Sequence, residues 1–129
     1  MPTVMTAAPT LGDLVKHDAN PEYSREIVTL KAGQEYPAGA VLGKITASGE
    51  YTLAPATETV GIEGAEVACA VLLENVDATA AEADGLVLAR GMSIVAENAL
   101  TMDASVDTAL ERELKTQQLA AYGIVVWQG

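Results

Sequence analysis

The sequence has no phenylalanine, and aromatic residues of all kinds make up only 4% of its 129 positions. Its core must therefore be built from Val, Leu, Ile and Ala. A single cysteine, Cys69, excludes an internal disulfide framework and a zinc site with several cysteine ligands. A single histidine, His17, argues against histidine-rich metal chemistry. The longest apolar run, Val67–Leu73, is far shorter than the about 20 residues of a membrane-spanning helix, which excludes such a helix.

Basic residues are scarce as well. Seven Lys and Arg stand against 18 Asp and Glu, which gives a net charge of −11. A chain this acidic repels nucleic-acid phosphates and anionic membranes, so we expect neither as a partner. The N-terminus has no basic residue before Lys16 and no apolar h-region, so we expect no signal peptide. The length fits one domain with an arm.

Residues 1–24 are predicted to form a flexible N-terminal arm. Pro2, Pro9 and Pro21 interrupt this segment, and its apolar residues follow no helical or strand period. Such a segment cannot offset its own ordering entropy. It still carries apolar side chains that a linker would not need, and we predict that they dock on a partner protein: Val4, Met5, Leu11, Leu14, Val15 and Tyr23. The alternative is a frayed terminus.

From Arg25 onward the pattern is typical of short β-strands separated by turns. Ser48-Gly49 marks a tight turn, Pro55–Gly64 reads as a polar loop, and Glu66–Val76 is the strand expected to be buried on both faces. Residues 77–84 read as an acidic loop or a single helical turn. The predicted strands are Arg25–Leu30, Ala40–Ala47, Glu50–Ala54, Glu66–Val76, Gly85–Ala89, Met92–Ala96 and Ile124–Trp127.

One helix is predicted near the C-terminus, and it makes the fold class mainly β with one C-terminal helix. Ser105 or Asp107 can cap its start, and Gly123 sits where a left-handed residue ends it. Glu111 and Lys115 have the spacing of a favourable helical ion pair. The apolar positions that lie roughly along one face are Val106, Leu110, Leu114 and Ala121.

The residues indicate no catalytic, cofactor or metal site, and we predict that the protein is not an enzyme. Cys69 lies in an apolar strand, where burial would make its thiol inert. The acidic residues Asp77, Glu82 and Asp84 do not have the spacing of a calcium loop, so a solvated loop is expected. Lys44 raises an alternative function, because biotinyl and lipoyl carrier domains present a lysine from a similar glycine-punctuated β-domain. Lys44 falls within a strand pattern and not at a turn.

The chain resembles the head decoration protein family of tailed bacteriophages, the lambda-type capsid-stabilising proteins. The similarity covers residues 25–127, and the most specific stretches, in order, are Ala40–Thr46 with its inner Gly43, Val71–Thr79, Leu86–Gly91 and Leu119–Val126. The resemblance implies a small β-barrel-like or β-tulip decoration-protein fold with little helix and an extended N-terminal arm. It also implies a structural protein without cofactors.

The resemblance further implies a homotrimer that is made in the host cytoplasm and attaches to the outer surface of the phage head. Trimers of this family sit at three-fold and quasi-three-fold positions of the expanded icosahedral capsid and stabilise it against the pressure of packaged DNA. Their arms are disordered when free and order by pairing with strands of the major capsid protein. Residues 25–129 would then form the trimerising domain. Besides a carrier domain that uses Lys44, a secreted adhesin module is an alternative, against which the expected lack of a signal peptide argues.

Overall fold

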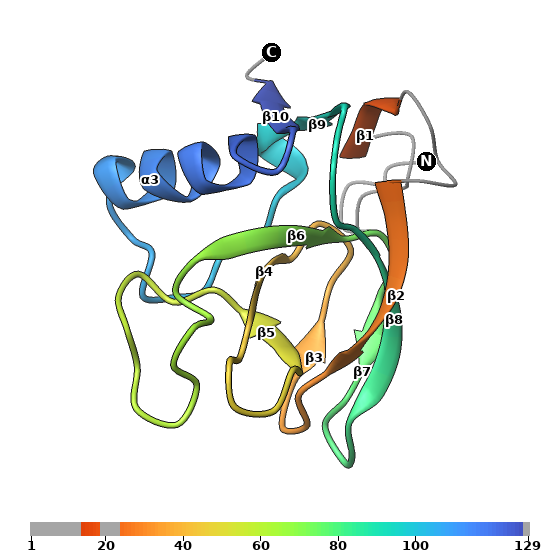
Figure 1. Ribbon diagram of the computed structural model, residues 1–129, viewed down its shortest axis with the longest axis vertical. Coiled ribbons are helices and arrows are strands. Elements are labelled where there is room, and N and C mark those ends of the chain that lie inside the picture. The colour runs from red at the N-terminus through yellow and green to blue at the C-terminus, as the bar shows by residue number, and fades with distance from the viewer. Residues whose placement is uncertain (1–13, 19–23, 128–129) are drawn as a thin grey trace, which may run out of the picture.

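The computed structural model describes residues 14–18 and 24–127. Within them the protein is mainly β-sheet, and α3 near the C-terminus is the one α-helix whose bounds can be given (Figure 1). This confirms the predicted fold class. The elements are β1 (Val15–Asp18), β2 (Arg25–Leu30), β3 (Glu35–Tyr36), β4 (Val41–Lys44), β5 (Tyr51–Leu53), β6 (Ala68–Leu72), β7 (Val76–Asp77), β8 (Ala83–Leu88), β9 (Ser93–Ala96), the 3₁₀ turn η2 (Glu97–Ala99), α3 (Ala109–Ala120) and β10 (Ile124–Trp127).

Five strands close into a small barrel in the order β2, β5, β4, β6 and β8, as a β-barrel-like fold predicts. β2 and β8 run antiparallel along all six residues of each. β4 and β5 form the predicted hairpin, in which Gly43 lies opposite Thr52 and residues 45–50 make the turn. Gly43 allows a close approach, because a Cβ atom there would overlap the backbone of Ala65. The segment before β6 can therefore lie directly against the barrel.

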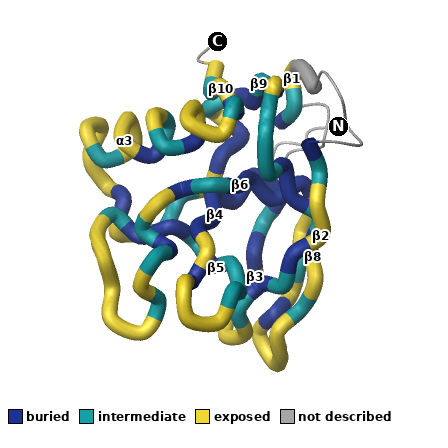
Figure 2. The backbone as a smooth tube through the Cα atoms, in the orientation of Figure 1, coloured by how far each residue is buried: buried dark blue, intermediate teal, exposed yellow. Residues whose placement is uncertain are grey.

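The barrel interior is the first of two apolar cores. Strand alternation sends Leu42 of β4 and Val87 of β8 inward, whereas their neighbours Val41 and Leu88 point outward. The tube view shows this buried centre as dark blue (Figure 2). The interior cluster consists of Val28, Leu30, Tyr36, Ala40, Leu42, Ala70, Leu72, Ala78 and Val87. Small residues such as Ala70 and Ala78 suit so narrow a barrel, which explains the shortage of aromatic residues.

The second core lies between the outside of the barrel and a layer formed by α3 and a three-stranded sheet, ordered β1, β9, β10 (Figure 1). We call this sheet the terminal sheet. β1 is antiparallel to β9, and β10 is parallel to it. Outward-facing Val41 and Leu88 meet Val95, Leu119 and Ile124 from this layer. Each such buried aliphatic side chain is worth roughly 1.5–3 kcal/mol before ordering costs.

The helix begins later than either predicted cap. Thr108 is the N-cap: its hydroxyl accepts a hydrogen bond from the Glu111 amide at 3.2 Å, and the Glu111 carboxylate accepts from the Thr108 amide, which completes a capping box. Ser105 instead accepts a hydrogen bond from the Ala56 amide at 2.9 Å, so it holds the distant loop that carries Ala56. The predicted caps at Ser105 and Asp107 are therefore wrong.

Burial along α3 does not follow the spacing of its apolar residues. Leu110 and Leu114 are exposed, while Lys115 and Leu119 are buried. The Lys115 ammonium donates to the Glu66 carbonyl and lies 3.4 Å from the Gln118 side-chain oxygen, which is why a lysine can be buried here. Lys115 therefore serves as a link to the start of β6, and not as the partner of Glu111 in a surface pair.

Candidate interaction surfaces

Two of the six predicted docking residues, Leu14 and Val15, lie in the folded unit. Leu14 is fully buried in the second core, and Val15 begins β1, where it pairs with Val95 of β9. Residues 14–18, which the sequence assigns to the arm, thus reach the folded domain: Val15–Asp18 pair with β9, and Leu14 packs in the second core. The pairing partner lies far along the chain, so no local pattern indicates it. The other four predicted docking residues, Val4, Met5, Leu11 and Tyr23, lie outside the described residues.

The outer face of the terminal sheet is apolar and exposed. Met92, Val125 and Trp127 are 75%, 49% and 60% exposed. Val125 and Trp127 stand on the same side of β10, because side chains alternate along a strand. A hollow of about 310 Å³ lies on this face, and its lining residues carry no charge: Met92, Ser93, Ile94, Gly123 and Val125. In a chain with 18 acidic residues, this uncharged hollow is a candidate contact for another protein, although β1 of the same sheet carries the exposed Lys16.

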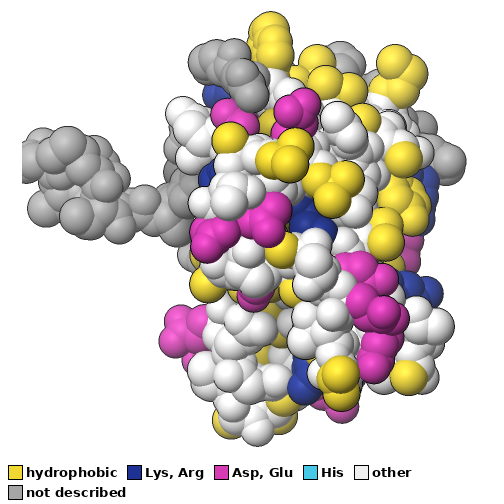
Figure 3. All heavy atoms as spheres, turned by 90° about the vertical axis from the view of Figure 1, so that its left-hand side faces the viewer, with side chains coloured by type: hydrophobic (Ala, Val, Ile, Leu, Met, Phe, Trp, Pro, Cys, Tyr) yellow, Lys and Arg dark blue, Asp and Glu magenta, His cyan; other side chains and the backbone are white. Residues whose placement is uncertain are grey.

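A second apolar surface runs along α3. Leu110 is 78% exposed and Leu114 45%. They lie in a groove of about 290 Å³ whose other lining residues are Ala56, Thr57, Glu111, Glu113 and Gln117, so two acidic residues border the leucines. Figure 3 shows this side of the molecule, where hydrophobic side chains lie among acidic ones. The sequence singled out both leucines by their helical spacing, which does not show whether they are buried. Their exposure makes them candidates for contact with another protein.

A polar hollow of about 460 Å³ surrounds Cys69 at one end of the barrel, and Lys44, Tyr51 and Arg90 also line it. Burial raises the pKa of the Cys69 thiol, and a hydrogen bond with the Lys44 backbone opposes this only in part. Burial likewise raises the pKa of Tyr51. Arg90 forms an ion pair with Glu26. These shifts disfavour a thiolate at neutral pH, so the hollow lacks an activated nucleophile.

Lys44 is the last residue of β4 and is exposed, with its register partner Tyr51 beside it in β5. The turn of this hairpin begins after it, at Ile45. Lys44 is thus displaced from the tip, where a carrier domain presents its modified lysine. Its geometry gives no support to the carrier alternative.

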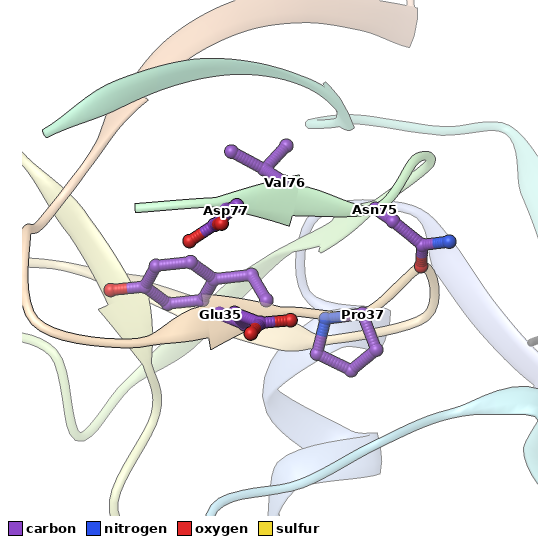
Figure 4. A pocket seen from close by; sticks show the side chains of 6 residues that line it. Glu35, Pro37, Asn75, Val76 and Asp77 are labelled. Atoms are coloured by element: carbon purple, nitrogen blue, oxygen red, sulfur yellow. The ribbon is translucent and has the colours of Figure 1, made fainter. Parts of the chain in front are cut away.

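A further hollow, of about 310 Å³, lies where β3 pairs with β7 (Figure 4). The Asn75 side-chain oxygen accepts a hydrogen bond from the Ala38 amide at 2.8 Å. The Tyr36 hydroxyl donates to the Lys31 carbonyl at 2.7 Å. Asp77 accepts from both the amide and the hydroxyl of Thr79, and these bonds hold the pKa of its carboxyl below the ordinary value. The polar groups of this hollow thus hold the loops in place.

The remaining acidic residues form no metal site in the parts of the chain described. No group of three His, Cys, Asp or Glu there comes close enough to hold a metal ion. The Asp84 carboxylate accepts a hydrogen bond from the Thr29 hydroxyl at 3.2 Å. Glu50 raises the pKa of the neighbouring Glu82 by hydrogen bonding and charge repulsion. Among the described helices, none is both long and apolar enough to cross a membrane.

The stretches that carry the family resemblance lie at structural junctions. Gly43 admits the backbone of Ala65, and Asn75 holds Ala38. Gly91, which ends the third stretch, lies directly against Gly123 of the fourth. Residues with this role preserve a fold and its surfaces.

The comparisons with known proteins agree with this geometry. A search of curated proteins gives no match. The family model described as bacteriophage lambda head decoration protein D matches residues 4–124, which is nearly the whole chain. With this match and its small β-barrel fold, the chain belongs to the bacteriophage lambda head decoration protein D family.

Proposed function

We propose that this protein binds the outer surface of an expanded icosahedral phage head as homotrimers and stabilises the shell against the pressure of packaged DNA. The trimers occupy three-fold and quasi-three-fold positions, after synthesis in the host cytoplasm. Family membership is the observation that carries this proposal, since it makes the protein a structural component that binds the phage capsid. The family is a structural one and not a class of enzymes.

The N-terminal arm is the proposed docking element, now shortened to residues 1–13. Leu14 is fixed in the second core, so the arm begins at the terminal sheet. Val4, Met5 and Leu11 remain its proposed anchors, while Leu14 and Val15 pack in the folded domain. An extended segment that pairs with a capsid strand gains main-chain hydrogen bonds and buries alternate side chains.

Trimerisation is supported by the apolar groove of α3. Leu110 and Leu114 lie on the outside of the monomer, and a neighbouring subunit can cover them. In a three-fold assembly this groove meets a different surface of the next copy. Three arms on one rigid trimer raise one another's effective concentration and give an avidity gain on the order of 10²–10⁴. Binding of this kind stabilises only the shell state that presents the sites.

Deletion of residues 1–13 tests the proposal. Full-length and truncated proteins are mixed with expanded and unexpanded heads that lack decoration protein, and bound protein is measured by co-sedimentation. We expect saturable binding of the full-length protein to expanded heads alone, and binding of the truncated protein weakened by about a hundredfold or more. Light scattering should show the same number of subunits for both proteins, and thermal melting should show the same stability. Equal binding by both would show that the arm is a frayed terminus.

A further inference from the structure

One end of the barrel interior is lined by polar side chains, whereas the rest of the interior is largely apolar. Strand alternation carries the inward face of β4 from Leu42 to Lys44, and that of β2 from Val28 to Glu26. In β5, Tyr51 lies opposite Lys44. The interior therefore ends in a polar hollow of about 460 Å³, which we call the barrel mouth.

A bulge in β6 adds Cys69 to the barrel mouth. The register of β6 against β4 shifts beside Gly43, so Cys69 and Ala70, which are neighbours in the chain, both pack against the interior cluster. Elsewhere on the rim, β2 and β5 pair only between Leu30 and Tyr51. The barrel mouth is therefore accessible between these two strands.

The polar ends of these side chains lie close enough to affect one another's ionisation. Burial raises the pKa of Tyr51 most, Cys69 and Glu26 raise it further, and Arg90 lowers it. Burial also raises the pKa of Cys69, which Lys44 lowers in part. Tyr51 thus keeps its proton at neutral pH, and its hydroxyl remains a hydrogen-bond donor.

The barrel mouth carries one uncompensated positive charge in a chain whose net charge is −11. Arg90 is balanced by its ion pair with Glu26. The Lys44 ammonium makes no hydrogen bond or ion pair within the described part of the chain, and Lys44 is exposed. An ammonium group beside a phenol hydroxyl is a pair of donors without an acceptor between them.

We propose that the barrel mouth binds a small carboxylate, whose oxygens accept hydrogen bonds from the Lys44 ammonium and the Tyr51 hydroxyl. One net positive charge suits a monoanion, and the Glu26 carboxylate disfavours a doubly charged phosphate. Mouths of β-barrels with a few convergent polar groups are frequent ligand sites. A free acid or an acidic side chain of another copy of this chain can supply the carboxylate. The site goes beyond the proposed function and does not depend on it.

The reactivity of Cys69 reports whether the barrel mouth is occupied, because the chain has no other cysteine. Labelling with iodoacetamide, an uncharged reagent, is followed at mildly alkaline pH while propionate replaces chloride at constant ionic strength. Propionamide, which has a similar shape without the charge, is the matched control ligand. We expect propionate to slow labelling severalfold, phosphate to slow it less, and propionamide to change it by less than about twofold.

Two substitutions of the same kind sharpen the test. Lys44→Gln removes the cation of the barrel mouth, and Lys16→Gln makes the identical change at an exposed lysine of β1. Since Lys44 itself affects the Cys69 pKa, each variant is compared with itself with and without propionate. We expect Lys44→Gln to weaken propionate binding by about tenfold and Lys16→Gln to change it by less than about twofold. Tyr51→Phe, expected to weaken binding severalfold, is the second variant if Lys44→Gln does not fold.

Dilution of the protein distinguishes the two sources of the carboxylate. If labelling without propionate slows as protein concentration rises, and Lys44→Gln abolishes this effect, another copy supplies the carboxylate. If concentration has no effect and propionate protects Cys69, the ligand is a free acid. The proposal is overturned if propionate protects no better than chloride and concentration has no effect, if phosphate protects better than propionate, or if Lys44→Gln is protected as well as the wild type. No phage head is used, so either result leaves the proposed function to its own test.

Discussion

Gly91 and Gly123 pack backbone against backbone: a Cβ atom on Gly91 would overlap the carbonyl oxygen of Gly123. Two hydrogen bonds fix this junction. The Gly91 amide donates to the Tyr122 carbonyl at 2.7 Å, and the Ser93 amide donates to the Gly123 carbonyl at 3.1 Å. Gly123 itself has a φ of +83°, which favours glycine. The contact sets the start of β9 beside the start of β10.

Gly91→Ala should therefore destabilise the protein by about 3 kcal/mol, because the new methyl group has backbone and not a flexible side chain in its way. The matched control is Gly61→Ala, where no atom lies within 4 Å and only the positive φ of +94° opposes the change. It should cost about 1 kcal/mol. Urea denaturation measures both. Equal losses for the two variants would mean that the junction can relax.

Leu14→Ala tests whether β1 belongs to the folded unit in solution. Leu14 is fully buried against the second core, so its truncation should cost about 3 kcal/mol of the free energy of unfolding. Lys16→Ala, on the same strand but exposed, should change stability by less than about 0.5 kcal/mol. Thermal melting of both variants decides the point. An unchanged melting temperature for Leu14→Ala would mean that residues 14–18 belong to the arm and not to the folded domain.

The buried Lys115 should make the free energy of unfolding depend on pH. Burial lowers the pKa of its ammonium group, so the unfolded chain binds more protons than the folded one in the alkaline range below the ordinary lysine pKa. Stability contributed by this group therefore rises with pH and is lost as pH falls through the folded pKa. We expect the stability of the wild type relative to Lys115→Met to increase between about pH 7 and about pH 10. Titration of Tyr51 and Cys69 is common to both proteins and cancels. The prediction would be contradicted if the stabilities of the wild type and of Lys115→Met changed with pH in the same way.

Cys69 should react slowly with a thiol reagent at neutral pH. Its pKa is raised by burial, so little thiolate is present, and its side chain is only partly accessible. Because the chain has one cysteine, the labelling signal comes from this residue alone. Denaturant should accelerate labelling strongly, and so should alkaline pH. Rapid labelling of the native protein at neutral pH would show that the hollow around Cys69 is more open than the structure has it.

Leu110→Glu should shift the protein from trimer to monomer, because a carboxylate in the groove of α3 would have to be buried between subunits. Ile27→Glu makes the same kind of change at a residue of β2 that is also exposed, and it should leave the mass unchanged. Light scattering at micromolar concentration distinguishes the two. A trimer that survives Leu110→Glu would place the subunit contact elsewhere.

The strands were predictable because their signals are local. The β-branched run Arg25–Leu30 and the Ser48-Gly49 turn act over a few residues, and the structure has β2 and the hairpin of β4 and β5 at these places. The helix cap was misplaced because the Ser105 hydroxyl is taken by the Ala56 amide, a contact between residues 49 positions apart. A local sequence pattern cannot show that a distant amide already occupies the hydroxyl that would cap the helix.

The candidate surfaces were harder to predict for a related reason. All four residues of Ile124–Trp127 are apolar, so the sequence does not indicate which two face the core and which two face outward. A lysine is usually a surface residue, and the sequence does not show that the Lys115 ammonium group donates a hydrogen bond to the Glu66 carbonyl. Leu110 and Leu114 have core spacing, but the helix turns Leu119 to the barrel instead. The exposure of each of these side chains depends on how α3 and the terminal sheet pack against the barrel.

Closure of the barrel has a consequence for how the protein behaves at high concentration. A strand whose hydrogen bonds are all satisfied within a ring offers no template on which another chain can add a strand of its own. In the described part of the chain, β2 pairs with β5 only through Leu30 and Tyr51, so much of its second edge lacks a strand partner, and β1 and β10 are the edge strands of the terminal sheet. Addition of a strand from another chain should therefore be confined to these edges.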